Sequence, residues 1–262
     1  DAIKGNDAND GKSLATAVAT ITKATKIANT PGDIVYIREG IYREKIIPVY
    51  SGTEAEPIVY KNYNGEQVTV SGTEVVNSGW QVHEGNIFKT NVPNSWYLGD
   101  GKEQVFINEE MVNPATWPHL PQPIYKSRNT DYATADTGSY SYDNSTGIYR
   151  GSYTSANLNS DNWTGGWALI LPGKAWAGQS VKIDNYTANK IDFTFKIAPN
   201  QPSNEPFFPK DKNFYFLWGK LEAIGPGEYF WDAAQSILYI WPKDENLDGK
   251  TIEVRTRDQG LN

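Results

Sequence analysis

The stretch PGDIVYIREGIYREKIIPVYSGTEAEPIVYKNYNGEQVTVSGT, residues Pro31–Thr73, places short β-forming runs between turn residues. Its runs consist of β-branched and aromatic residues, and glycine or proline separates them about every ten to twelve residues. A hairpin meander can have this spacing, but it favours two-residue turns such as Asn-Gly, which are scarce here. The pattern therefore favours a solenoid of parallel strands, in which each coil buries its apolar side chains against the next. The expected strands are Ile34–Ile37, Ile46–Val49, Ile58–Tyr60 and Val68–Val70.

One helix is expected before these strands. In SLATAVATITKATKIAN, residues Ser13–Asn29, apolar side chains recur at intervals of three and four residues, which is the period of a helix face. Ser13 is a suitable N-cap, and Pro31-Gly32 would end the helix. A solenoid has an open apolar end that must be covered, so we expect this helix to be its cap.

The residues after position 80 differ in character. They are richer in Ser, Asn, Thr, Gly and Tyr, and runs such as Asp136–Gly147 are typical of long surface loops. The run IDFTFKI, Ile191–Ile197, alternates strictly, which indicates a sheet with one solvated face. We expect an inserted antiparallel β subdomain here, with a sandwich-like arrangement. Its strand-like segments are Glu103–Ile107, Trp167–Leu171, Val181–Ile183 and Ile191–Ile197.

Several of these segments resemble a known group of proteins. GNDANDG (Gly5–Gly11), the expected helix and Pro31–Thr73 resemble the N-terminal end of secreted right-handed parallel β-helix proteins. These are the pectate-lyase-like superfamily and its glycoside hydrolase relatives, some of which carry an inserted β-sandwich. Phe214–Glu245 is similar to a segment that precedes the later coils of such proteins. The resemblance implies a mainly β fold: the N-terminal part of a parallel β-helix, one capping α-helix, and an inserted antiparallel subdomain.

This interpretation divides the chain into three segments. Residues 1–79 would form the N-terminal cap and first coils, residues 80–204 the inserted subdomain, and residues 205–262 the strands that lead into further coils. Thr251–Thr256 is typical of a strand, and the sequence stops where the proteins it resembles continue. We therefore expect the chain to be a truncated part of a longer protein.

Composition narrows the classes of partner. The chain of 262 residues has no cysteine and a net charge of −7, with no basic cluster, so a nucleic acid is not expected as a partner. No apolar run is long enough for a transmembrane helix. Nine tryptophans and sixteen tyrosines offer abundant aromatic surface for sugar rings. We expect a secreted or cell-surface protein whose partner is a polysaccharide or oligosaccharide.

Three residues are candidates for carbohydrate binding. Trp117 and His119 lie in the proline-rich loop ATWPHLPQP, where the indole can stack on a sugar and the imidazole can bind hydroxyl groups. The alternative is that Trp117 packs at a seam and His119 caps a backbone carbonyl. Trp163 lies beside Gly165-Gly166 and is the tryptophan of its segment that we expect to be exposed. The other histidine, His83, is expected on the surface.

No catalytic residue stands out. Glycoside hydrolysis uses two carboxylates at a set separation, but none of the 31 acidic residues is singled out as one of a pair. The resemblance implies that reacting residues come from later coils, outside this chain. The oxygen-rich loop Gly5–Gly11 can be interpreted as a Ca²⁺ site, although it does not fit the EF-hand pattern, or as a turn in which Asx side chains bind their own backbone.

The functional prediction follows from these observations. We expect the N-terminal region of a secreted polysaccharide-active enzyme, with a glycoside hydrolase as the first choice. The alternatives are a polysaccharide lyase and a non-catalytic carbohydrate-binding region of a cell-surface protein. A purely structural surface role is the least favoured.

Overall fold

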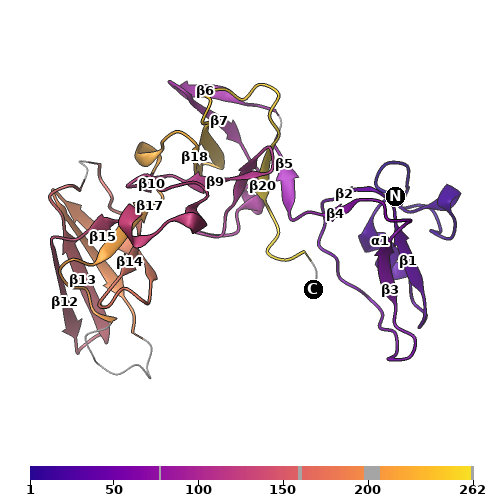
Figure 1. Ribbon diagram of the computed structural model, residues 1–262, viewed down its shortest axis with the longest axis horizontal. Coiled ribbons are helices and arrows are strands. Elements are labelled where there is room, and N and C mark those ends of the chain that lie inside the picture. Colours follow the sequence, from indigo (N-terminus) through magenta and orange to yellow (C-terminus); the bar gives the residue numbers. More distant parts are fainter. Residues whose placement is uncertain (77, 159–160, 198–206, 261–262) are drawn as a thin grey trace. The chain divides into compact units, whose positions relative to one another are not determined.

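The computed structural model describes residues 1–76, 78–158, 161–197 and 207–260 (Figure 1). By their internal contacts the residues divide into two compact units. Unit 1 comprises Asp1–Val76, Pro93–Glu103 and Ile252–Asn262, and unit 2 comprises Asn77–Val92 and Gln104–Thr251. The predicted segments 1–79, 80–204 and 205–262 stay a prediction, and the boundary at 204–205 lies outside the described residues. No helix in the described part of the chain is both long enough and apolar enough to span a lipid bilayer.

Unit 1 holds small strand pairs. Parallel pairing joins β1 to β3 and β2 to β4, and antiparallel pairing joins β5 to β20. Its strands are β1 (Ile34–Ile37), β2 (Gly40–Tyr42), β3 (Val59–Asn62), β4 (Val68–Val70), β5 (Thr73–Val75) and β20 (Ile252–Arg255), and a short 3₁₀ turn, η2, spans Asn94–Trp96.

The expected parallel β-helix is wrong. Each parallel pairing in the described residues stops at two strands, and the larger sheets of the chain are antiparallel or mixed. The apolar side chains that stacked coils would bury remain exposed: Ile34 is 46%, Tyr36 is 52% and Ile41 is 53% exposed. The sequence spacing correctly located β1 and β4, because strand formation depends on local residue type. It said nothing reliable about which strands pair, because pairing depends on contacts between distant residues.

The expected long helix is also wrong. The segment forms a 3₁₀ turn, η1 (Leu14–Thr16), and a separate seven-residue helix, α1 (Ile21–Ile27). The Asp7 carboxylate accepts hydrogen bonds from the backbone N–H groups of Ala19 and Thr20, both at 2.9 Å, which holds the chain out of helical geometry between the two. Glu44 then accepts from the N–H groups at the start of α1. The periodic pattern spans both pieces, but these side-chain acceptors divide it.

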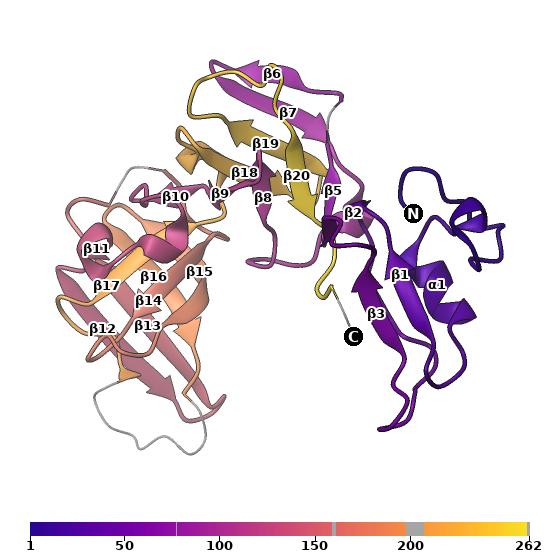
Figure 2. The ribbon, with the colours of Figure 1, turned by 45° about the vertical axis from the view of Figure 1, so that its right-hand side comes forward.

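Unit 2 contains an eight-stranded antiparallel sheet (Figure 2). Its long strand β15 pairs with β14 through its first residues and with β16 through its last residues, and the register of the β15–β16 pairing shifts between Ile183 and Asn185. The strands therefore form one continuous sheet, whereas a sandwich-like arrangement was expected. The order is β10 (Thr116–Trp117), β17 (Phe214–Trp218), β14 (Trp167–Leu171), β15 (Gln179–Thr187), β16 (Lys190–Phe195), β13 (Ile148–Thr154) and β12 (Thr137–Asp143), with β11 (Ala133–Thr134) also paired to β17.

A mixed sheet forms the rest of unit 2. Antiparallel pairings join most of its strands, and β9 pairs with β18 in parallel. Its strands in this unit are β8 (Val105–Ile107), β9 (Glu110–Pro114), β18 (Glu228–Asp232), β19 (Ile237–Trp241), β7 (Ile87–Asn91) and β6 (Gln81–Glu84). In the described part of unit 2, the 3₁₀ turns η3 (Ile124–Lys126) and η4 (Asn129–Asp131) lie between β10 and β11, and η6 (Leu221–Ala223) connects β17 to β18.

The core of unit 2 follows the two-residue period of its strands. The alternation predicted for Ile191–Ile197 is confirmed over β16, where Ile191, Phe193 and Phe195 are at most 2% exposed and the residues between them are half-buried. Ala168 and Ile170 of β14 are fully buried in the same way. One face of the antiparallel sheet therefore carries the core, and the other face presents the intervening residues.

Replacing Ile170 by alanine should lower the free energy of unfolding by about 2–4 kcal/mol, because it leaves a cavity in a fully buried site. Val82→Ala on β6 is the matched control, since Val82 is 62% exposed, and it should change stability by less than about 0.5 kcal/mol. Urea unfolding of the two variants checks this. Equal losses in both variants would contradict the assignment of the core.

Candidate functional site

The loop that follows β9 is held in shape by a buried asparagine. Asn113 is fully buried, and its side-chain amide donates to the carbonyls of Leu120 and Pro121, both at 3.1 Å. Its side-chain oxygen accepts from the N–H of Ile124 at 2.7 Å. These three bonds tie the far end of the loop back to β9, so the proline-rich loop has a defined path.

His119 stands on this loop above a buried carboxylate. Its Nδ1 lies 3.2 Å and 3.1 Å from the two carboxylate oxygens of Glu228, at the start of β18. The Glu228 side chain is 4% exposed, whereas that of His119 is 62% exposed. A histidine of unit 2 is thus anchored from below and open to solvent above.

Glu228 is fully engaged by donors. Besides His119, its carboxylate accepts from the Thr116 hydroxyl at 3.1 Å and from the N–H of Gly225 at 2.8 Å. The imidazole also lies close over Gly225, since a Cβ at that position would come within 2.7 Å of its Cε1 atom. A buried carboxylate needs such partners, because an unpaired charge in the interior is costly. The donors therefore fix the ring in one orientation.

This geometry sets the chemistry of His119. With Nδ1 directed at the carboxylate, Nε2 has no protein partner among the described residues and can accept from or donate to a ligand hydroxyl. The hydrogen bond to Glu228 raises the pKa of His119, and partial burial of the ring opposes this rise. The pair can therefore bind hydroxyl groups or transfer a proton.

Trp117 is placed differently from its neighbour. It is half-buried on β10 and packs against Tyr215 with ring centroids 6.2 Å apart, at the edge of the core. The structure thus brings His119 to the surface while Trp117 covers the core. Carbohydrate binding by either residue stays a prediction.

The expectation that Trp163 is exposed is wrong. Trp163 is 0% exposed and belongs to the core of unit 2. The N–H of Gly166 donates to the Trp163 carbonyl at 2.9 Å, and the N–H of Gly165 donates to the Ile183 carbonyl. The two glycines form a tight turn that is hydrogen-bonded to β15, and the indole beside this turn lies in the core instead of on the surface. A buried indole offers no surface to a sugar. His83 is exposed as predicted, and its ring lies 5.0 Å from that of Tyr239.

Sequence reasoning missed two features of this region. Glu228 was not linked to His119, because 109 residues separate them. The stacking of Trp167 on Trp218 was not predicted either: both side chains are half-buried, their ring centroids lie 5.5 Å apart, and the Lys182 ammonium lies over the Trp167 ring. The alternation of side chains along Trp167–Leu171 could have indicated this position of Trp167, because it places Trp167 and Ala168 on opposite faces of the strand.

The loop Gly5–Gly11 uses its oxygens internally. The Asp7 carboxylate accepts from Ala19 and Thr20, Asn6 accepts from the N–H of Ala8, and Asp10 accepts from the N–H of Lys12. Burial of the Asp7 carboxylate tends to raise its pKa, but the hydrogen bonds from Thr20 and Ala19 outweigh this, so the pKa of Asp7 is lowered. In the described residues, no group of three or more His, Asp or Glu side chains is placed to hold a metal ion.

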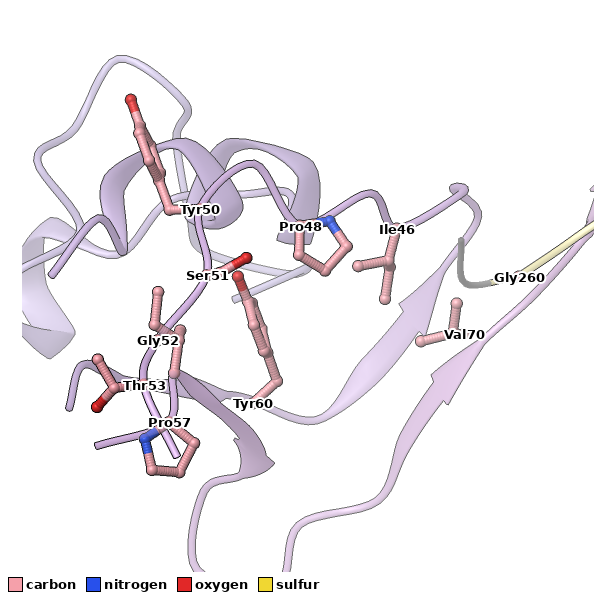
Figure 3. Close-up of a pocket in the computed structure, with 11 residues that line it drawn as sticks. Ile46, Pro48, Tyr50, Ser51, Gly52, Thr53, Pro57, Tyr60, Val70 and Gly260 are labelled. Atoms are coloured by element: carbon pink, nitrogen blue, oxygen red, sulfur yellow. The ribbon is translucent and has the colours of Figure 1, made fainter. Parts of the chain in front are cut away.

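Each unit also contains a cavity. One in unit 1, of about 730 Å³, is lined by Ile46, Pro48, Tyr50, Tyr60 and their neighbours and has no charged side chain in its wall (Figure 3). One in unit 2, of about 370 Å³, adjoins the His119 loop through Gln122 and Gly227, which are hydrogen-bonded to each other. Lys243, Lys250, Glu110 and Asp244 line it, so it offers both donors and acceptors.

Comparisons with known proteins support a likeness of fold. Over 98% of its length this chain is similar to a solved glycoside hydrolase, with a TM-score of 0.68 and 19% sequence identity. The complex of XylC with xylose is also similar, with a TM-score of 0.46 and 17% identity over 98% of the chain. These matches cover 46% and 31% of those chains. At this level of identity, the first match shows a shared fold.

In sequence, the chain is 36% identical over 77 residues to the uncharacterized protein YwoF of Bacillus subtilis (strain 168). That match covers 29% of this chain and 16% of YwoF. The comparison with known protein families finds no match. The chain thus spans less than half the length of the solved chains it resembles and a small part of YwoF.

Glu228→Gln should lower the pKa of His119, because the substitution keeps the shape of the side chain but removes its negative charge. An NMR titration of the imidazole protons measures this directly. His83, the other histidine of the chain, is the internal control, and its titration curve should not move. An unchanged curve for His119 would show that Glu228 does not act on it.

The same pair should make stability depend on pH. Because the pKa of folded His119 is raised, its contribution is complete below the unfolded value of about 6.5 and is lost as pH rises through the folded value. The difference in unfolding free energy between the wild type and His119→Gln should therefore be larger at pH 5 than at pH 9. Urea unfolding at both values tests this, and a difference that grows toward pH 9 would contradict it.

Proposed function

We propose that this chain is a carbohydrate-binding part of a glycoside-hydrolase-related protein, and that His119 contacts the bound saccharide. The observation that carries the proposal is the exposed imidazole held on the buried carboxylate of Glu228. A donor or acceptor fixed in this way loses little conformational freedom on binding a hydroxyl group. The fold likeness to a glycoside hydrolase over nearly the whole chain supports the same class of protein.

The role proposed for this chain is binding rather than hydrolysis. Most glycosidases need two carboxylates on either side of the scissile bond. The pair at this site is one carboxylate and one histidine, and the carboxylate is buried and already bound by three donors: His119, Thr116 and Gly225. Hydrolysis of a polysaccharide by the whole protein is part of the proposal and would use other groups. A secreted or cell-surface location is also proposed, because large polysaccharides do not cross membranes.

The test is isothermal titration of the wild-type chain with xylo-, cello- and manno-oligosaccharides and with oligogalacturonate. We expect millimolar or tighter binding of at least one, and a weakening of about tenfold in His119→Ala from the loss of a hydrogen bond to a partly charged group. His83→Ala is the matched control, since His83 is also exposed in unit 2. The proposal fails if the wild type binds none of the probes or if both histidine variants behave alike.

A further inference from the structure

Four residues on neighbouring strands of the antiparallel sheet lie in one row. Trp218 of β17 is the direct cross-strand partner of Thr116 on β10 and of Trp167 on β14, and Trp167 is the partner of Lys182 on β15. Residues directly opposite each other point to the same face of a sheet. Ala168, one residue further along β14, is buried in the core, so the row lies on the other face. We call Thr116, Trp218, Trp167 and Lys182 the aromatic row.

The centre of the row is a stack of rings. The planes of Trp167 and Trp218 differ by 13°, and their centroids lie 5.5 Å apart. The ammonium group of Lys182, on β15, lies 5.4 Å from the centroid of the Trp167 ring. Because β15 and β17 flank β14 on opposite sides, Lys182 and Trp218 lie on opposite sides of Trp167. Trp218 therefore shares one ring face with Trp167, and its other face is on the side of β10, where the small side chain of Thr116 stands.

The row continues to His119. Thr116 is itself fully buried, and its hydroxyl donates to Glu228, which in turn holds the exposed imidazole of His119, so this link runs beneath the surface. Hydrogen-bonding groups thus stand at both ends, His119 at one and Lys182 at the other, with aromatic surface between them. Neighbouring strands are about 4.8 Å apart, so four strands span about 14 Å, which is longer than one sugar ring.

We propose that the aromatic row and His119 form one extended site for a linear oligosaccharide that lies across the strands. Because the two indoles stack on each other and Lys182 lies over Trp167, the sugar rings pack their C–H groups against the outward edges of the stacked rings. The hydroxyl groups of the sugars bind His119 and Lys182. The sugars are neutral, because the chain has a net charge of −7 and Lys182 is the one cation of the row, already placed over an indole. This inference rests on the proposed function and adds the length and charge of the ligand.

The first experiment measures affinity against ligand length. Xylo- and cello-oligosaccharides from the monosaccharide to the hexasaccharide are titrated into the wild-type chain by calorimetry. Affinity should rise with each added sugar until the row is filled and then level off, and oligogalacturonate of equal length should bind more weakly. Equal affinity for the monosaccharide and the hexasaccharide would overturn the extended site.

The second experiment removes the row. Trp218→Ala and Trp167→Ala should each weaken hexasaccharide binding by about tenfold, since each removes a large apolar contact. Lys182→Ala should weaken it by a smaller factor, and because Lys182 is exposed this variant should fold normally. Trp176→Ala is the matched control: Trp176 is 68% exposed and packs against Phe207, outside the row.

Thermal melts of every variant, with Trp218→Phe as a conservative replacement that keeps an aromatic ring, separate loss of binding from loss of fold. Trp218→Phe should retain most of the affinity. If the wild type binds but Trp218→Ala, Trp167→Ala and Lys182→Ala all match Trp176→Ala, the extended site is wrong while binding at His119 stands. If the wild type binds no oligosaccharide, the proposed function itself fails.

Discussion

The buried carboxylate of Glu228 is the constraint on which the surface of unit 2 depends. A charge removed from water must be compensated by donors, and here Thr116, Gly225 and His119 supply them. Each donor comes from a different turn or strand, so satisfying one carboxylate fixes three pieces of backbone. Asn113 does the same for the far end of the loop. Two buried polar side chains thus hold an exposed histidine in place.

The second constraint is the two-residue period of the antiparallel sheet. Once Ala168 and Ile170 face the core, Trp167 must face the other way, and the cross-strand register brings Trp218 and Lys182 beside it. The stack of rings is therefore a consequence of core packing on the opposite face. A slip of one residue in β14 would bury Trp167 and expose Ala168, so the core and the aromatic row depend on the same register.

The likeness of this mainly β chain to a solved glycoside hydrolase concerns the fold. The residues of the proposed site are an anchored imidazole, a stacked pair of indoles and a lysine. They do not form the carboxylate pair that hydrolysis needs. Binding and hydrolysis are thus separate questions for this protein, with different residues at stake.

Residue type and spacing alone were enough to locate individual strands such as β1, β4 and β14 and to identify the buried face of β16, because these depend on side chains close together in the sequence. The same patterns misled about the helix, which Asp7 and Glu44 divide and cap, and about the solenoid, whose coils require pairings that the chain does not make. The link between His119 and Glu228, the burial of Trp163 and the stacking of Trp167 on Trp218 came from folding alone. Each depends on a contact between residues distant along the chain, and no local propensity encodes which distant partner a side chain will meet.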